Sequence, residues 1–132
     1  MHMNDSIFTK IIRGDIPSHK IYEDDRVFAF LDIHPVSEGH VLVVPKTPAE
    51  FVWDMAADDY QALMAAVQKV GTQLRDVSGR PYVSMRTVGT DVPHAHVHLI
   101  PFTETRDLHH APDMNAEPDH AALAAWAEKI KL

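Results

Sequence analysis

The distribution of apolar and polar residues along this chain predicts five strands and three helices. Short runs that are apolar or alternate with polar residues, and that end at turn residues or proline, are typical of strands. Strands are therefore expected at residues 20–23, 26–32, 40–45, 82–86 and between Pro93 and Pro101. Apolar residues at helical spacing predict a short helix from Ser6, its expected N-cap, to Gly14. They also predict a long helix between Ala49 and about Val77, with Asp54 or Asp58 as its N-cap, and a final helix from Pro118 to Ile130.

These elements predict an α+β fold. An antiparallel sheet of about five strands is expected, with the long helix packed on one face and short helices near both ends of the chain. A length of 132 residues fits one domain, residues 1–132, that can bury a core. Such a sheet has edge strands that a second copy of the chain could cover, which is compatible with a homodimer.

The composition excludes several classes of function. The chain has 12 basic and 19 acidic residues, and the resulting net charge of −7 argues against double-stranded nucleic acid as a partner. Small anionic ligands stay possible, because a local site can be positive on an acidic protein. No apolar run is long enough to span a membrane, and residues 1–6 lack the features of a signal peptide, so a cytoplasmic protein is expected.

The most informative motif is a run of three histidines at every second position, His94, His96 and His98. If the run is a strand, the three imidazoles share one face and the interleaved apolar residues enter the core. Three interpretations are open: a solvated face, a metal site in which two of the imidazoles and a further ligand bind zinc, and acid–base or nucleophilic chemistry. Chemistry is favoured, because serine, threonine or lysine would serve equally well on a solvated face.

The stretch His94–Ile100 resembles the His-x-His-x-His-x-x motif of the histidine-triad (HIT) superfamily of nucleotide hydrolases and transferases. Four further blocks resemble that family in the expected order, so that the resemblance runs from Ile7 to Pro101. These blocks are residues 7–17, 22–25, 29–35 and 39–46. The resemblance is greatest to the purine-nucleoside phosphoramidase (Hint-like) branch, and it implies a HIT-like fold and a homodimer.

The resemblance also implies a reaction at the α-phosphate of a nucleotide. His96 matches the family's nucleophile, which forms a covalent nucleotidyl-histidine that water then cleaves. His98 matches the residue that hydrogen-bonds phosphate oxygens and helps the leaving group depart. His94 and the distant His40 match the supporting histidines, which orient the other two.

The remaining site residues are also implied by the resemblance, and they would hold an AMP-like purine nucleotide. Asp32 matches the carboxylate that binds the ribose hydroxyls. An apolar slot for the base is expected from Ile7, Phe8, Ile11, Phe30, Leu31, Ile33 and Leu42. Contacts to the phosphates or the leaving group are expected from Arg86, Gly89, Thr90 and Asp91.

The segment before the triad departs from the family pattern, because the loop that follows Arg86 is shorter than usual. Asp91 stands where a hydroxyl residue is common, and its carboxylate would repel phosphates unless it were protonated or paired, for example with Arg86. This substitution suggests an amine or cationic leaving group. With no cysteine in the chain, no thiolate zinc site is expected, and we expect no bound metal or cofactor.

Three hypotheses for the function follow. The first is a nucleotide hydrolase or transferase that acts on a purine nucleoside phosphoramidate, with a diadenosine-polyphosphate hydrolase as its near alternative. The second is a nucleotide-binding regulatory module with little catalysis. The third is a histidine-rich metalloprotein.

Overall fold

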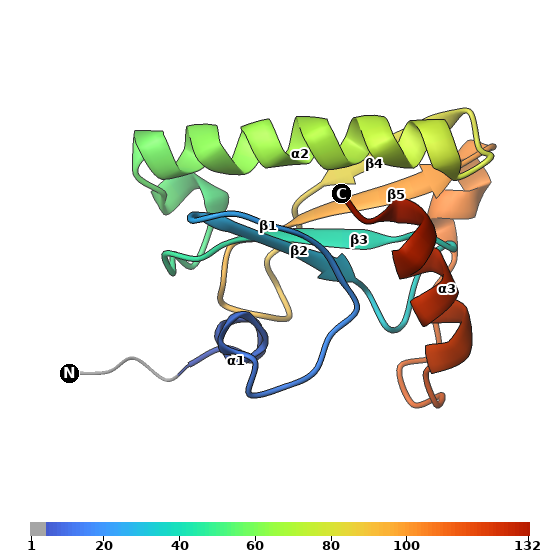
Figure 1. Cartoon of the computed structure of the whole chain (residues 1–132), viewed down its shortest axis with the longest axis horizontal. Coiled ribbons are helices and arrows are strands. Elements are labelled where there is room, and N and C mark those ends of the chain that lie inside the picture. The colour runs from blue at the N-terminus through green and yellow to red at the C-terminus, as the bar shows by residue number, and fades with distance from the viewer. Residues whose placement is uncertain (1–4) are drawn as a thin grey trace.

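A computed structural model describes residues 5–132, which form three α-helices, five strands and two short 3-10 helices (Figure 1). The elements, in chain order, are α1 (Ile7–Arg13), β1 (Lys20–Glu23), β2 (Val27–Leu31), β3 (Val41–Pro45), η1 (Val52–Asp54), α2 (Ala57–Val77), β4 (Tyr82–Arg86), β5 (Val97–Phe102), η2 (Thr105–His109) and α3 (His120–Ile130). Residues 1–4, on which part of the signal-peptide expectation rests, lie outside the described residues.

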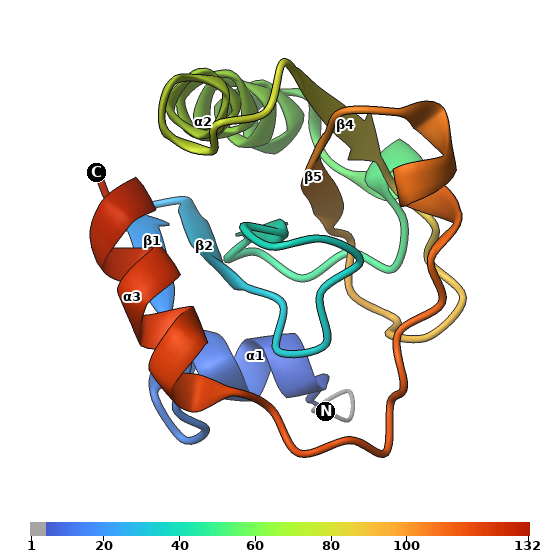
Figure 2. The same ribbon diagram turned by 90° about the vertical axis from the view of Figure 1, so that its right-hand side faces the viewer.

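The five strands form one antiparallel sheet in the order β1-β2-β3-β5-β4, so β1 and β4 are its edges. The long helix α2 covers one face of the sheet and the short helix α1 lies over the other (Figure 1). Helix α3 lies beside β1 and β2, as Figure 2 shows. The predicted α+β fold, with a five-stranded antiparallel sheet and one long helix, is confirmed.

Alternate residues of the central strands separate the interior into two apolar clusters. One cluster lies between the sheet and α2, and its strand residues include Val27, Ala29, Leu31, Val41, Val43, Val97 and Leu99. The other lies between the sheet and α1, and consists of Phe8, Ile11, Phe28, Phe30, Leu42 and Val44. Because side chains alternate across a strand, Asp32, His40 and His98 fall on the α1 face.

Helix α1 has the start and the end that its sequence predicts. Ser6 is its N-cap, and the Ser6 hydroxyl accepts a hydrogen bond from the Thr9 N–H at 3.1 Å. Gly14 ends the helix in the left-handed conformation, with φ at 83°. The helix is therefore fixed at both ends, although it has only seven residues.

Three predicted starts differ from the structure by more than one residue. The triad strand begins only at Val97, so His94 and His96 precede it. The long helix begins at Ala57 after a short 3-10 helix, and neither Asp54 nor Asp58 caps it, because Ala56 occupies the N-cap position. The final helix begins at His120 rather than at Pro118. Asp119 is its N-cap, and the Asp119 carboxylate accepts the Ala122 N–H at 3.1 Å.

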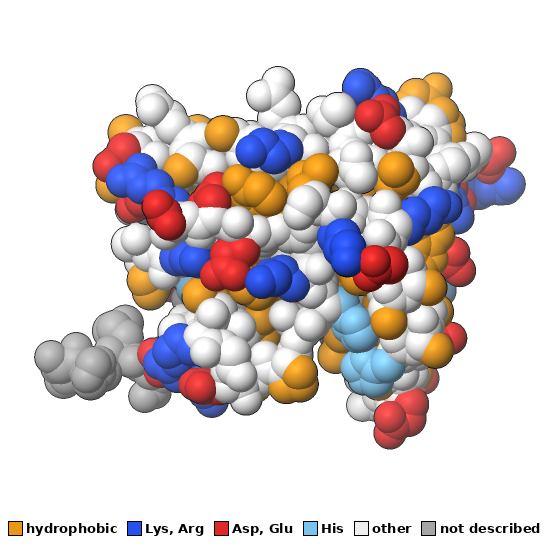
Figure 3. Space-filling view, viewed as in Figure 1, with side chains coloured by type: hydrophobic (Ala, Val, Ile, Leu, Met, Phe, Trp, Pro, Cys, Tyr) orange, Lys and Arg blue, Asp and Glu red, His pale blue; other side chains and the backbone are white. Residues whose placement is uncertain are grey.

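Acidic and basic side chains are interspersed over the face shown in Figure 3, with histidines gathered beside α3. This face carries no broad patch of one sign. Among residues 5–132, no helix combines the length and the apolar character that crossing a bilayer needs. The cytoplasmic location stays a prediction from the sequence.

Candidate active site

The first two histidines of the triad are held in an irregular segment at the N-terminal end of β5. His94 and His96 are almost fully buried, although neither belongs to the strand. The segment is tied to the chain before α2 by the Ala95 N–H, which donates to the Ala49 carbonyl at 2.7 Å. The ring centroids of His96 and His98 lie 4.9 Å apart, so these two imidazoles face the same space.

The hydrogen bonds of His96 determine which of its ring nitrogens carries the hydrogen. Nδ1 lies 2.7 Å from the backbone carbonyl of His94. A carbonyl oxygen only accepts, so Nδ1 must be the donor. A neutral imidazole has one N–H, which leaves Nε2 with a free lone pair. His96 is therefore held as the tautomer whose Nε2 can attack an electrophile.

The same argument fixes the ring hydrogens of His40 and His98, which form a hydrogen-bonded pair that we call the relay. The Val36 N–H donates to His40 Nδ1 at 3.1 Å, so the hydrogen of this ring is on Nε2. That Nε2 lies 2.9 Å from His98 Nδ1 and donates to it. His98 consequently carries its own hydrogen on Nε2, where it can be donated to a ligand. A backbone amide thus sets the tautomers of two side chains in succession.

Both rings of the relay are neutral at neutral pH. Burial is the main cause that lowers the pKa of His40 to about 3, with smaller contributions from His98 and Arg86. Burial also lowers the pKa of His98 to about 4, followed by the effects of His96 and Arg86, while Asp91 acts in the opposite direction. The relay is therefore a hydrogen-bond donor toward the site rather than a cation.

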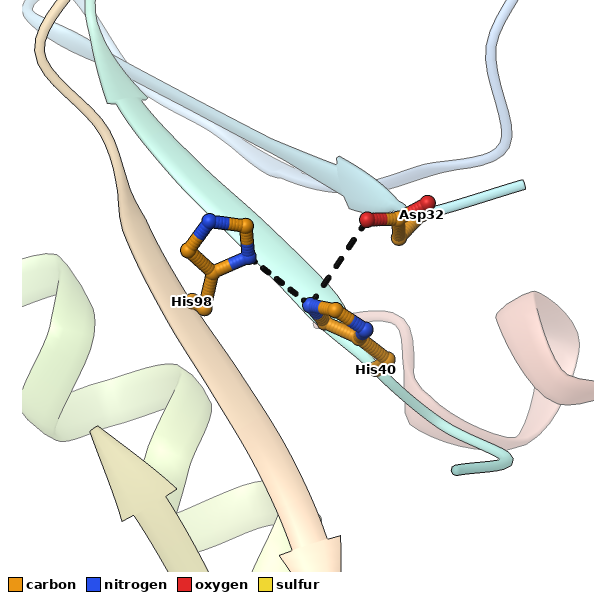
Figure 4. A group of neighbouring side chains, drawn as sticks. All are labelled: Asp32, His40 and His98. Carbon is orange, nitrogen blue, oxygen red and sulfur yellow. Dashed lines mark hydrogen bonds and ion pairs between the residues drawn. The ribbon is translucent and has the colours of Figure 1, made fainter. Parts of the chain in front are cut away.

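Asp32 lies at the end of β2 next to these two histidines (Figure 4). Its Oδ1 accepts the His34 N–H at 2.8 Å, and its Oδ2 lies 3.7 Å from His40 Nε2. Burial raises the pKa of the Asp32 carboxyl, a shift that the His34 amide and the nearby imidazoles oppose. Asp32 was predicted beside the triad, and the structure brings it there.

Asp32, His40 and His98 each offer a ligand atom, and these atoms lie within 4.8 Å of one another. This donor set has the composition of a zinc site. A metal needs the lone pair of an imidazole nitrogen, however, and the Val36 N–H already occupies the lone pair of His40 while Nε2 carries the hydrogen. The backbone of Val36 therefore opposes a metal ion at this position.

The predicted apolar slot is only partly assembled as expected. Phe8, Ile11, Phe30 and Leu42 pack together under α1, on the same face as the histidines. Ile7 and Ile33 have exposed side chains, 48% and 41% accessible, and offer apolar surface that is free to meet a ligand. The prediction for Leu31 is wrong: alternation along β2 turns its side chain to the opposite face, where it packs in the α2 cluster.

The predicted phosphate contacts lie on β4 and the loop after it. Arg86 is the cross-strand partner of His98, so the two side chains emerge on the same face of the sheet. Arg86 and Asp91 are exposed, and the ion pairs formed within residues 5–132 do not include either of them, so the suggested Arg86–Asp91 pair is not observed. Thr90 is exposed as well.

Gly89 is required where it stands. Its φ is 82°, and a Cβ at this position would lie 3.1 Å from the ring of Phe51. Only glycine fits both the left-handed conformation and this close approach. The loop from β4 to the triad is thereby folded against the segment before α2.

The sequence alone did not indicate two groups of contacts. The Val36 amide fixes the tautomer of His40, and the Pro45 carbonyl, which accepts from His94 Nε2, fixes that of His94, but a backbone group has no residue-type signal. Ser6 and Thr9 contact His94 through their hydroxyls, at 3.0 and 3.3 Å from its Nδ1. Ser6 was expected only as a helix cap, and 88 residues separate it from His94.

Comparison with known proteins agrees with this geometry. The model of the HIT domain matches residues 13–105, more than half of the chain. Protein hit of Bacillus subtilis (strain 168) is 43% identical over 102 residues, which cover 72% of this chain and 69% of that protein. The purine nucleoside phosphoramidase of Escherichia coli (strain K12) is 35% identical over 103 residues, covering 73% and 86%.

A solved structure supports the same assignment over nearly the whole chain. The crystal structure of a Hit-like protein involved in cell-cycle regulation from Bartonella henselae superimposes with a TM-score of 0.85 and 31% sequence identity, covering 98% of this chain and 96% of that one. With its triad, its fold and these matches, the chain belongs to the HIT family, in the Hint-like branch that contains the purine nucleoside phosphoramidases.

Proposed function

We propose that this protein is a nucleotide hydrolase that acts at the α-phosphate of a purine nucleoside phosphoramidate through a covalent intermediate on His96. The observation that carries the proposal is the bond from His96 Nδ1–H to the His94 carbonyl, which leaves Nε2 unprotonated beside the donor of His98. A buried imidazole with a fixed tautomer is a preorganised nucleophile. The names of the phosphoramidase relatives support the substrate class.

In the first step, the lone pair of His96 Nε2 forms a bond to phosphorus as the P–N bond of the substrate breaks. The electron pair of that bond stays on the leaving nitrogen, which departs as an amine after taking a proton from solvent. His98 Nε2–H donates a hydrogen bond to the phosphate or the leaving atom. The His94 carbonyl stabilises the positive charge that the His96 ring gains.

In the second step, water attacks the phosphorus of the intermediate and the P–Nε2 bond breaks. Its electron pair returns to Nε2, and the proton of the water leaves to solvent. The nucleotide is released as the monophosphate, and His96 regains the tautomer with which it began. Because phosphoryl-type transfer needs mainly positioning and charge stabilisation, four histidines and a few donors suffice.

The nucleotide would lie along the α1 face. Asp32 would accept the ribose hydroxyls, and the base would contact Ile7 and Ile33, backed by Phe8, Ile11, Phe30 and Leu42. Arg86, Gly89, Thr90 and Asp91 would line the end where the leaving group departs. What supports this placement is the strand order: β2, which Asp32 and Ile33 follow, and β4, which ends at Arg86, lie on opposite sides of β3 and β5 in the sheet.

A diadenosine-polyphosphate hydrolase is the second candidate, and Arg86 favours it. An exposed guanidinium beside His98 that forms no ion pair within residues 5–132 is suited to further phosphates in the leaving group. Comparing kcat/KM for adenosine phosphoramidate and diadenosine tetraphosphate separates the two. A higher value for the phosphoramidate supports the first proposal, and a higher value for the tetraphosphate overturns its substrate class.

The enzyme and the regulatory module are separated by His96→Ala. If the protein is an enzyme, this variant loses turnover and still binds AMP, as titration calorimetry would measure. If the wild-type protein binds AMP tightly and turns over neither substrate, the regulatory module is correct. Activity that is removed by a chelator and restored by zinc would instead favour the metalloprotein.

We also propose that the protein is a homodimer that pairs through β4. This edge strand has the exposed apolar side chains Tyr82 and Met85, and a hollow of about 460 Å³ between β4 and α2 is lined by them together with residues such as Val67 and Gly71. A paired edge would bury this surface. The mass in solution tests the proposal, and a monomer at micromolar concentration contradicts it.

A further inference from the structure

His94 is a buried imidazole that the proposed reaction does not use directly, and both of its nitrogens are bonded. Nε2 lies 2.8 Å from the Pro45 carbonyl and therefore donates to it. Nδ1 has no hydrogen in that tautomer and must accept. With 1% of the residue exposed, water does not satisfy this nitrogen, so its partner has to come from the protein.

Two hydroxyls of α1 provide that partner. Ser6 Oγ lies 3.0 Å from His94 Nδ1, Thr9 Oγ1 lies 3.3 Å from it, and the two hydroxyls are 3.2 Å apart. Ser6 Oγ also accepts the Thr9 N–H, which leaves its hydrogen available for the ring. A hydroxyl donates one hydrogen and accepts others, so Ser6 can cap the helix and donate to His94 at once.

The pair is coupled to the proposed nucleophile through the backbone of His94. The carbonyl of His94 is the acceptor for His96 Nδ1–H, and so the position of this residue decides the tautomer of His96. Phe8, which lies between Ser6 and Thr9 in α1, packs its ring edge-on against both imidazoles, with centroids 6.0 Å from His94 and 4.9 Å from His96. One turn of helix therefore contacts both rings.

We infer that Ser6 and Thr9 are positioning residues for the reaction. Their hydroxyls fix the tautomer and the position of His94, and the His94 carbonyl in turn keeps His96 Nε2 free of hydrogen. The catalytic part of this inference rests on the proposed function. Without the hydroxyls, Nδ1 of His94 is an unpaired buried acceptor, and the ring gains by turning or by exchanging its hydrogen between nitrogens. Either change removes the hydrogen bond from His94 Nε2–H to the Pro45 carbonyl. The His94 carbonyl, which accepts from His96 Nδ1–H, is then held less firmly in place.

Three double variants separate the donor from the helix cap, all with Thr9→Val to remove the second hydroxyl. Ser6→Thr keeps both cap and donor, Ser6→Asp keeps the cap but has no hydrogen to donate, and Ser6→Ala loses both. We expect Ser6→Thr to retain kcat within about twofold and the other two to lose kcat about tenfold, with KM changed by less than about twofold. Thr72→Val, which removes a hydroxyl from α2 that bonds Gln68, is the control and stays at the wild-type rate.

A second readout does not depend on activity. Long-range proton–nitrogen NMR spectra of the free protein report which ring nitrogen of His96 carries the hydrogen. We expect Nδ1–H in the wild-type protein and the Ser6→Thr variant, and a mixture of tautomers in the Ser6→Asp variant. The spectra remain decisive if the protein turns out to hydrolyse neither test substrate, so the two proposals can fail separately.

Two results would overturn the inference. If Ser6→Asp with Thr9→Val has the wild-type kcat and a single His96 tautomer, only the cap matters. If kcat falls in all three double variants, Ser6→Thr included, the loss follows from packing rather than from the donated hydrogen. Should the Ser6→Ala variant not fold, the Ser6→Asp variant, in which the helix keeps its cap, still decides between these outcomes.

Discussion

The two faces of the sheet are made of alternate residues of the same strands, yet they are built in different ways. Toward α2, the side chains of β2, β3 and β5 are aliphatic and form one apolar cluster with those of the helix. Toward α1 lie His98 of β5 and two residues next to the strand ends, Asp32 and His40, and each of these side chains is held by specific hydrogen bonds to neighbouring groups.

Because successive side chains of a strand point to opposite faces of the sheet, one face can serve stability while the other carries the candidate chemistry. The α2 face depends on the apolar area it buries, which many sequences could supply. The α1 face depends on single donors and acceptors, because a buried polar group without a partner is costly. Substitutions on the two faces should therefore have different signatures, and the predictions below test that difference.

The largest effect is expected from His96→Ala on the α1 face. Removing the proposed nucleophile should lower kcat by about 1,000-fold or more, because the proposed mechanism has no second group that attacks phosphorus. Steady-state kinetics with adenosine phosphoramidate measures this loss, and AMP binding serves as the control for an intact site. A residual kcat within tenfold of wild type would mean that another group attacks.

The opposite signature is expected from Leu63→Ala on the α2 face. Leu63 is fully buried in the aliphatic cluster, so the cavity should lower the free energy of unfolding by about 2–5 kcal/mol. Urea denaturation measures the change, and kcat at a temperature where the variant is folded should stay near wild type. A large fall in kcat of the folded variant would show that the two faces are not independent.

The pH dependence of stability should come from the α1 face. In the unfolded chain, imidazoles take up a proton below about pH 6.5, whereas the folded protein holds the pKa of His40 at about 3 and of His98 at about 4. Between these values the unfolded state binds more protons, so the free energy of unfolding falls as the pH falls. The slope is up to about 1.4 kcal/mol per pH unit for each group.

Urea denaturation between pH 6.5 and 4.5 tests this expectation. His98→Asn removes one of the buried titrating rings and should make the slope shallower, whatever it does to stability at pH 7. Leu63→Ala should leave the slope unchanged, because it removes no titrating group. An identical slope in His98→Asn and wild type would contradict the assignment of a buried neutral ring.

The smallest effect is expected at the exposed end of the site. Arg86→Gln should lower kcat/KM for diadenosine tetraphosphate by only about two- to fivefold, because an exposed charge is screened by water. The value of kcat/KM for the phosphoramidate should change less. Asp91→Asn is the matched variant of opposite charge and should raise kcat/KM for the tetraphosphate. Equal changes with both substrates would remove Arg86 and Asp91 from leaving-group recognition.

Much of the fold could be predicted, because alternation and turn residues are local signals. The bounds of β1 and β4 follow the sequence pattern to the residue, and Ser6 and Gly14 mark the ends of α1. The resemblance to the HIT family also indicated Asp32 and His40, which no spacing relates to the triad. Family motifs carried this long-range information, which periodicity does not contain.

What could not be predicted depends on contacts between distant segments. The triad was predicted to be a regular strand, but His94 and His96 are buried against α1, and the chain there bonds to Ala49 rather than to a neighbouring strand. Leu31 was placed in the base slot although strand alternation turns it away from Phe30. The Val36 amide, which sets the tautomers of His40 and His98, has no signature in the sequence.

The most direct test is to trap the intermediate. Wild-type protein mixed with adenosine phosphoramidate, quenched within the first turnover and kept at a pH that preserves phosphorus–nitrogen bonds, should gain the mass of one adenylyl group. Peptide mapping should place that group on His96, and His96→Ala should acquire none. An adduct on another residue, or turnover without any adduct in rapid-quench samples, would contradict the attack by His96 Nε2.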